Sequence, residues 1–145
     1  MRTVAIIQAR MGSTRLPGKV LLPLAGKPSL WHIVERLGRV NAIDEVVVAT
    51  STSPADDSIR EFCARHDVAM YSGSEDDVLD RYYQTALSRD ADTILRVTGD
   101  CPLVDPDITA DLVAIHHQNP ASYNGIASGG GVASLGLNGF PDGLG

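Results

Sequence analysis

The residues best suited to chemistry lie in one segment near the N-terminus, residues 8–19, which reads QARMGSTRLPGK. The segment bends at two glycines and carries three cations, Arg10, Arg15 and Lys19. Glycine lets backbone N–H groups approach a ligand closely, because no Cβ atom stands in the way. Fixed cations beside such a bend bind phosphate oxygens. The segment therefore predicts a polyphosphate site in which Arg15 and Lys19 stabilise negative charge.

The distribution of charge favours the same site. The chain of 145 residues has a formal net charge of -6, yet residues 1–34 contain five basic side chains and no acidic one. A plain solvent-exposed basic surface is the alternative explanation for such a cluster. Because the protein as a whole is acidic, we expect no nucleic-acid partner.

The spacing of the segment differs from that of the common phosphate-binding loops. Five residues separate Gly12 from Gly18, whereas a Walker A loop has four residues between its first glycine and the Gly-Lys pair. Val20 follows Lys19, so the hydroxyl that holds magnesium in a Walker A loop is missing. A dinucleotide-binding G-x-G-x-x-G pattern is absent too. The segment is therefore predicted to be a phosphate loop of another kind.

A second chemical feature is Asp100, in the segment TGDCP at residues 98–102. It follows an apolar run at 93–98 that is typical of a strand. Mg²⁺ is usually bound by one or two carboxylates, with phosphate oxygens and water in the remaining positions. The alternative is that Asp100 only accepts hydrogen bonds from turn amides. Beside a cationic triphosphate loop we favour the metal site, with Asp100 as ligand and Mg²⁺ as cofactor.

Alternating strands and helices must position these two loops. Apolar runs predict strands at 3–8, 45–50, 68–71 and 93–98. Capping residues and prolines predict helices that begin near Pro28, Ser53, Ser74 and Asp105. This alternation is typical of an α/β protein with a parallel sheet, whose loops after the strands lie along one carboxyl edge.

Apolar spacing also predicts which helix faces are buried. It assigns Leu79, Tyr82, Tyr83 and Ala86 to the inner face of the third helix, and Ile108, Leu112 and Ile115 to that of the fourth. Asp56 is predicted to complete a capping box that begins at Ser53. Residues 20–24 are apolar but interrupted by proline, so we expect them to be extended.

Length and composition indicate one domain. Residues 1–124 are predicted to form a nucleotide-binding α/β domain, and residues 125–145, with eight of the fourteen glycines, a glycine-rich loop or the truncated start of a sugar-binding part. No apolar run is long enough to cross a membrane, and no membrane partner is expected. The two cysteines, Cys63 and Cys101, lack metal-ligand spacing, which together with the absence of a signal peptide favours the cytoplasm.

Three motifs carry a resemblance to a known family: QARMGSTRLPGK at 8–19, GSEDDVLDR at 73–81 and TGDCP at 98–102. Together they resemble the cytidylyltransferases, and most closely the spore coat polysaccharide biosynthesis type, akin to acylneuraminate and KDO cytidylyltransferases. The resemblance covers about residues 3–120. It implies a three-layer, Rossmann-like, mostly parallel sheet of the nucleotide-diphospho-sugar transferase fold, truncated at the C-terminus.

The resemblance also implies an activity, the transfer of CMP from CTP to a sugar with release of pyrophosphate. In that reaction Arg10, Arg15 and Lys19 hold the triphosphate, and Asp100 ligates Mg²⁺. The residues implied to bind the nucleotide are Gln8, Ala9, Arg10, Met11, Gly12, Ser13, Thr50, Ser51 and Arg81.

The chain departs from the family in two places. The sugar-acid enzymes carry Gln where this chain has Thr98, so an acidic sugar substrate stays open. Members of the family also continue beyond residue 145, and the later part supplies a second metal-binding aspartate, much of the sugar pocket and a dimer arm. Asp142, in a segment that resembles the family's Tyr-Pro-Asp-Gly-Leu, is implied to bind the sugar. A full-length chain is expected to be a homodimer.

Two other functions stay open. One is a nucleotidyltransferase that uses another base, such as a guanylyltransferase, although the motif typical of that class is lacking. The other is a non-catalytic nucleotide-binding fragment, which would bind CTP without releasing pyrophosphate.

Overall fold

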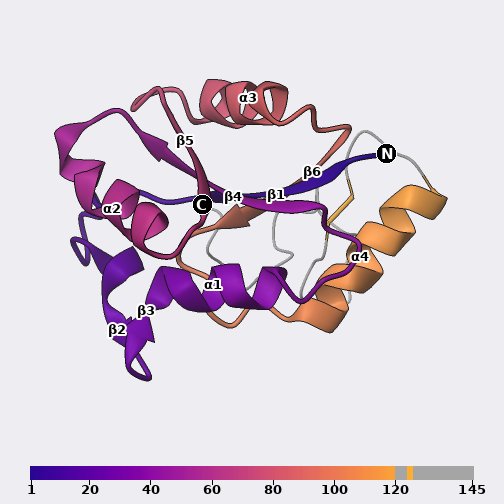
Figure 1. The fold of residues 1–145 in the computed structure, drawn as a ribbon, viewed down its shortest axis with the longest axis horizontal. Helices are drawn as coiled ribbons and strands as arrows, with labels where there is room; N and C mark the ends of the chain where they lie inside the picture. The colour runs from indigo at the N-terminus through magenta and orange to yellow at the C-terminus, as the bar shows by residue number, and fades with distance from the viewer. Residues whose placement is uncertain (120–123, 126–145) are drawn as a thin grey trace.

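The computed structural model describes residues 1–119 and 124–125 and shows an α/β fold around one parallel sheet (Figure 1). The sheet has four strands in the order β5-β4-β1-β6, and each neighbouring pair is parallel. The strands are β1 (Thr3–Gln8), β4 (Glu45–Ser51), β5 (Ala69–Gly73) and β6 (Thr93–Thr98).

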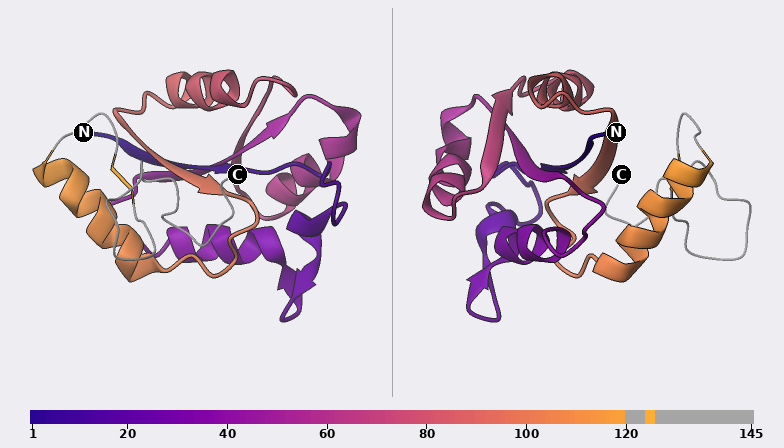
Figure 2. Two further views of the ribbon diagram at one scale, coloured as in Figure 1. Left: turned by 180° about the vertical axis from the view of Figure 1, so that it is seen from behind. Right: turned by 45° about the vertical axis from the view of Figure 1, so that its right-hand side comes forward.

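Helices cover both faces of this sheet (Figures 1 and 2). One face carries α1 (Ser29–Leu37), α2 (Asp57–Arg65) and α4 (Pro106–Gln118), and the opposite face carries α3 (Val78–Ser88). Two short 3-10 helices, η1 (Lys19–Leu21) and η2 (Pro54–Asp56), follow β1 and β4, and an antiparallel hairpin joins β2 (Pro23–Leu24) to β3 (Lys27–Pro28). The helices on both faces make the three layers that the sequence predicts.

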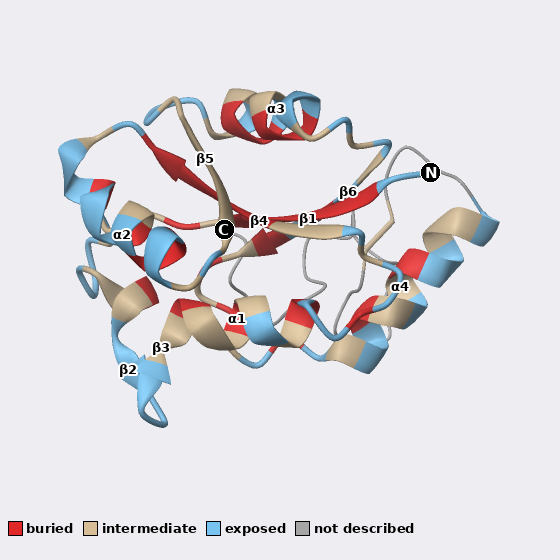
Figure 3. Ribbon diagram, in the orientation of Figure 1, coloured by how far each residue is buried: buried red, intermediate tan, exposed pale blue. Residues whose placement is uncertain are grey.

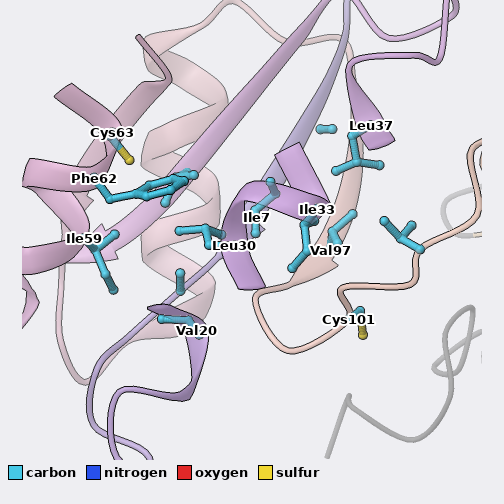
Figure 4. Close-up of a cluster of buried hydrophobic side chains, with 14 of the residues drawn as sticks. Ile7, Val20, Leu30, Ile33, Leu37, Ile59, Phe62, Cys63, Val97 and Cys101 are labelled. Atoms are coloured by element: carbon cyan, nitrogen blue, oxygen red, sulfur yellow. The ribbon is translucent and has the colours of Figure 1, made fainter. Parts of the chain in front are cut away.

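The central strand β1 is buried on both sides (Figure 3). Val4, Ala5, Ile6 and Ile7 are all fully buried, which is why this strand is a continuous apolar run rather than an alternating one. Its side chains alternate between a larger core under α1 and α2, drawn in Figure 4, and a smaller core under α3. Both cores therefore hold the end of β1, and with it the start of the phosphate loop, in place.

The order of the strands creates a crevice at the carboxyl edge. From β1 the chain adds β4 and β5 on one side, then crosses through α3 on the opposite face and adds β6 on the other side of β1. The loops after β1 and β6 start from neighbouring strands, and both lead toward the face that carries α1 and α4. In open α/β sheets such a point of reversal is where ligands bind.

The structure confirms the predicted strands and helices but corrects the buried faces of two helices. On α3, Leu79 is 80% exposed and Tyr83 57% exposed, while Arg81 and Thr85 are buried beside Tyr82 and Ala86. Arg81 lies directly over Gly73, where an added Cβ would come within 3.2 Å of its Cγ. The missing side chain at Gly73 leaves room for a long residue on the inner face.

The fourth helix is rotated in the same way. Its buried residues are Thr109 and Val113, with Leu112 packed against the larger core, while Ile108 and Ile115 are about half exposed. Residues 20–24 were predicted to be extended, and that is wrong for Val20 and Leu21, which lie in η1, where Val20 is buried. The prediction for the glycine-rich end, including Asp142, falls on residues 126–145, outside the described part of the chain.

Candidate functional site

A cavity of about 500 Å³ opens at the carboxyl edge, between the ends of β1 and β6. It is the crevice expected at the point where the strand order reverses. Most of its lining comes from the loops that follow these two strands. The lining residues are Gln8, Arg10, Gly12, Ser13, Thr14, Lys19, Val20, Val78, Arg96, Thr98, Gly99 and Asp100.

The loop after β1, which we call the phosphate loop (residues 9–18), is closed on one backbone carbonyl. The oxygen of Met11 accepts hydrogen bonds from the N–H groups of Ser13 and Gly18, both at 2.9 Å. Gly18 has φ 69°, a left-handed conformation that glycine adopts without strain. This closure directs the chain into η1 and brings Lys19 to the wall of the cavity.

Lys19 and Asp100 face each other across the cavity. The Lys19 Nζ donates a hydrogen bond to Asp100 Oδ2 at 3.2 Å. Burial would raise the pKa of Asp100, but hydrogen bonds from Thr98 and Lys19, together with the charge of Lys19, outweigh burial and lower this pKa. Asp100 is therefore ionised at neutral pH. The two loops thus place a cation and an anion side by side, the pair that a phosphate group and a metal ion would need.

Gly99 lets the second loop approach the first. Its N–H donates to the carbonyl oxygen of Gln8 at 2.7 Å, extending the β1–β6 pairing by one residue. A Cβ atom at Gly99 would lie 2.7 Å from that same oxygen. Only glycine fits this position without a backbone shift. The contact between Gly99 and Gln8 therefore fixes the position of the backbone at Asp100.

The predicted nucleotide-binding residues fall into two groups. Gln8, Arg10, Gly12, Ser13, Lys19 and Asp100 line the cavity together. Six others do not line it: Ala9, Met11, Arg15, Thr50, Ser51 and Arg81. Arg15 lies exposed on the outside of the phosphate loop. The nucleotide-binding roles of both groups stay predictions.

Thr50 and Ser51 are buried at the end of β4, and Arg81 is buried on α3 next to Gly73, the last residue of β5. Burial and the nearby charge of Arg10 lower the pKa of the Arg81 guanidinium. Its Nη1 donates to the backbone oxygen of Ser74 at 2.6 Å, while its Nε and Nη2 have no hydrogen-bond partner within the described residues. Arg10 makes a parallel contact with the next carbonyl, that of Glu75, at 3.2 Å. Arg10 therefore ties the loop before α3 to the phosphate loop, whereas Arg81 ties that same loop to α3.

Sequence reasoning missed two residues that shape the site. Asp56 does not complete a capping box; its side chain is buried and accepts a hydrogen bond from Met11 N at 2.7 Å. Burial would raise the pKa of Asp56, but hydrogen bonds from Met11 and Ser51 outweigh burial and lower it. Arg96 lines the cavity from β6 and lies over the ring of Tyr82, 5.3 Å from its centroid. The available signal was position, since both residues are near the carboxyl ends of strands.

The donor set suits a metal ion that is held only partly by protein. Among residues 1–119 and 124–125, no three His, Cys, Asp or Glu side chains are grouped closely enough to hold an ion. A single ionised carboxylate beside a phosphate site matches the way Mg²⁺ binds, with phosphate and water completing its shell. Asp100 is therefore compatible with Mg²⁺. In the same described residues, no helix is both long and apolar enough to span a membrane.

Comparison with known proteins adds independent information. A family profile described as cytidylyltransferase matches residues 4–133. The spore coat polysaccharide biosynthesis protein SpsF of Bacillus subtilis is 39% identical over 139 residues, which cover 92% of this chain and 56% of that protein.

Two solved structures are similar in fold and in sequence. A cytidylyltransferase from Leptospira borgpetersenii has a TM-score of 0.78 at 39% identity, covering 83% of this chain and 50% of that one. A CMP:2-keto-3-deoxy-manno-octonic acid synthetase complexed with CTP has a TM-score of 0.72 at 31% identity, covering 83% and 49%. The chain therefore spans about half the length of the proteins it matches.

Proposed function

The chain belongs to the cytidylyltransferase family, and on that premise we propose that the protein transfers CMP from CTP to a sugar and releases pyrophosphate. The observation that carries the proposal is the cavity between β1 and β6, where Lys19 and Asp100 meet beside a glycine-containing phosphate loop. It is supported by the CTP complex of a structural relative that is 31% identical.

The reaction asks the protein mainly for positioning and charge. A hydroxyl oxygen of the sugar attacks the α-phosphorus of CTP and loses its proton to water, the bond from that phosphorus to the bridging oxygen breaks, and pyrophosphate leaves with the bonding electrons. Pre-organised cations stabilise the charge that develops on the leaving group. Arg10 and Lys19 line the cavity, which supports this role for them. Arg15 would have to turn inward from its exposed position to join them.

Asp100 would hold the Mg²⁺ of the bound nucleotide. When bound, this ion neutralises phosphate charge and polarises the reacting phosphate. Lys19, released from its pair with Asp100, would then donate to phosphate oxygens. The ion pair at 3.2 Å sets the two side chains beside each other at the cavity.

The sugar belongs, in our proposal, to surface polysaccharide synthesis, the process in the name of the Bacillus subtilis relative. The other relative's name identifies a sugar acid. In this chain Arg96 lies at the cavity wall next to Thr98, on the same strand. A guanidinium binds a carboxylate through two hydrogen bonds, so Arg96 is the candidate partner if the sugar is acidic.

Nucleotide selectivity tests the proposal. Thermal unfolding of the 145-residue chain is measured with CTP, UTP, ATP or GTP, each with and without Mg²⁺. Binding to the folded state alone stabilises by RT ln(1 + [L]/Kd), about 2.7 kcal/mol at a hundredfold excess over Kd. We expect the largest stabilisation with CTP and Mg²⁺. An equal shift with GTP would contradict the choice of base, and no shift with any nucleotide would contradict the site.

Turnover separates an enzyme from a binding fragment. Pyrophosphate release is followed with CTP, Mg²⁺ and a panel of neutral and acidic sugars, using the chain and a version extended to the length of its relatives. Release that depends on a sugar supports the transferase. CTP binding without release in either version would favour the non-catalytic alternative.

A further inference from the structure

Asp56 is a buried carboxylate that touches the phosphate loop without lining the cavity. It ends η2, between β4 and α2, and is only 3% exposed. The next residue, Asp57, has the same side chain but is 64% exposed and pairs with Arg60 in the same helix. Burying a charge is costly unless hydrogen bonds compensate for it, so the burial of Asp56 requires specific partners.

Those partners come from the phosphate loop and from the last residue of β4. Oδ1 of Asp56 accepts from the backbone N–H of Met11 at 2.7 Å, and Oδ2 accepts from the N–H of Ser51 at 3.3 Å and from its hydroxyl. Met11 and Asp56 are 45 positions apart in the chain. The carboxylate thus ties the phosphate loop to the carboxyl end of β4.

The contact with Met11 falls at the residue that closes the loop. The carbonyl of Met11 accepts from Ser13 and Gly18, while its N–H donates to Asp56. The peptide groups on both sides of Met11 are therefore hydrogen-bonded, one within the loop and one to Asp56. The loop's internal closure sets its shape, and the bond to Asp56 sets where that shape lies relative to the sheet.

We infer that Asp56 is a positioning residue, which holds the phosphate loop against β4 so that its N–H groups and cations meet the triphosphate. The inference rests on the proposed function for its ligand. Within the described residues, the hydrogen bond that joins Asp56 to the loop is the one from Met11 N–H. We call the hydrogen bonds from Met11 and Ser51 to Asp56 the clamp. Hydrogen bonds to a charged acceptor stabilise more than hydrogen bonds between neutral groups, so these few bonds hold the loop strongly.

Asparagine is the matching substitution. Asp56→Asn keeps the shape but replaces one oxygen with an NH₂ group, which cannot accept. Either Met11 or Ser51 then faces a donor instead of an acceptor. Asp57→Asn makes the same chemical change one residue away on the exposed side, and is the control.

Trypsin reports on the loop without any nucleotide, because Arg10 and Arg15 lie in it. The rate of native-state cleavage after Arg15 is compared with the denaturation midpoint and with CTP affinity in Mg²⁺. We expect Asp56→Asn to be cleaved about tenfold faster and to bind CTP about tenfold more weakly, the size of one lost hydrogen bond to a charged group. Asp57→Asn should match the wild type in both.

The outcomes separate the inference from the proposed function. Cleavage of Asp56→Asn at the wild-type rate, or faster cleavage with unchanged CTP affinity, would overturn the positioning role. Equal acceleration at sites throughout the chain would overturn it too, because it would show general destabilisation. If the wild type binds no nucleotide, the proposed function fails while the cleavage rates still decide whether Asp56 clamps the loop.

A second variant covers the case in which Asp56→Asn does not fold. Ser51→Ala removes one donor to the carboxylate and leaves Met11 bonded. We expect it to fold and to be cleaved after Arg15 faster than the wild type. Cleavage at the wild-type rate would count against the clamp.

Discussion

Replacing Asp100 with asparagine separates the charge of this residue from its shape. The substitution keeps the side chain's volume and removes its ion pair with Lys19, which joins Nζ to Oδ2 at 3.2 Å. The two side chains are 39% and 27% exposed, so water screens the pair. Partly exposed pairs of this kind contribute about 1 kcal/mol or less. The free energy of unfolding should therefore fall by no more than about 1 kcal/mol.

The effect on ligand binding should be larger and should depend on magnesium. Without Mg²⁺, Asp100→Asn removes a negative charge from the cavity and frees Lys19, so the variant should bind CTP at least as tightly as the wild type. With Mg²⁺, the wild type gains affinity through the carboxylate and the variant does not. At a hundredfold excess of CTP over the wild-type Kd in Mg²⁺, the ligand stabilises the wild type by about 2.7 kcal/mol, and the variant should lose part of this stabilisation.

Urea denaturation with and without CTP, in Mg²⁺ or in chelator, measures both effects on the same samples. Asp107→Asn, an exposed change in the first turn of α4, is the control. The reasoning is refuted if Mg²⁺ increases the stabilisation by CTP equally in Asp100→Asn and in the wild type. A loss of several kcal/mol without any ligand would refute the assignment of a screened pair.

Three further predictions follow from single contacts. Lys19→Ala should lower turnover roughly 10²-fold, the cost of losing one pre-organised charge stabiliser, and near-normal pyrophosphate release would remove Lys19 from the mechanism. Gly99→Ala should destabilise the fold by about 1–3 kcal/mol, because the added Cβ would lie 2.7 Å from a backbone oxygen. Gly12→Ala is the control and should change the denaturation midpoint little, because the atom nearest to a Cβ added there is 3.6 Å away. Burial raises the pKa of the Cys63 thiol from 9.0 to about 11, so the folded state resists its ionisation. Unfolding relieves this resistance, and stability should therefore fall by about 2–3 kcal/mol as pH rises from about 9 to about 11, a loss that Cys63→Ala should lack in pH-dependent urea titrations.

Strand positions could be predicted from the sequence because the sheet is buried on both faces. A strand such as β1 has no solvent-facing side, so apolar residues follow one another and mark the element without ambiguity. Family membership was also predicted correctly, since the three motifs that carry it lie at or near the carboxyl edge and are specific. Helix faces were harder to predict, because they depend on what the neighbouring elements leave room for.

The third helix shows why hydrophobic spacing failed. Its inner face holds a guanidinium and a hydroxyl, Arg81 and Thr85, and both are satisfied partly by nearby backbone oxygens. Its outer face carries Leu79 and Tyr83. Arg81 donates to the loop before α3 and Thr85 to the carbonyl of Arg81 in the same helix, so each polar group is buried where a backbone oxygen is within reach. A prediction from apolar spacing alone therefore assigns the exposed face of α3 to the core.

The candidate site also contains residues that could be predicted from the sequence and one that could not. Lys19 and Asp100 could be predicted as partners because each follows a strand, and parallel neighbours bring the ends of their strands together. Asp56 could not, because the sequence presents two adjacent aspartates and only packing decides which one is buried. The choice between them depends on the N–H of Met11, a backbone donor that any residue would supply at that position. Residues that line the cavity are thus visible as side-chain types, whereas a residue that contacts the loop through a backbone bond emerges only from the fold.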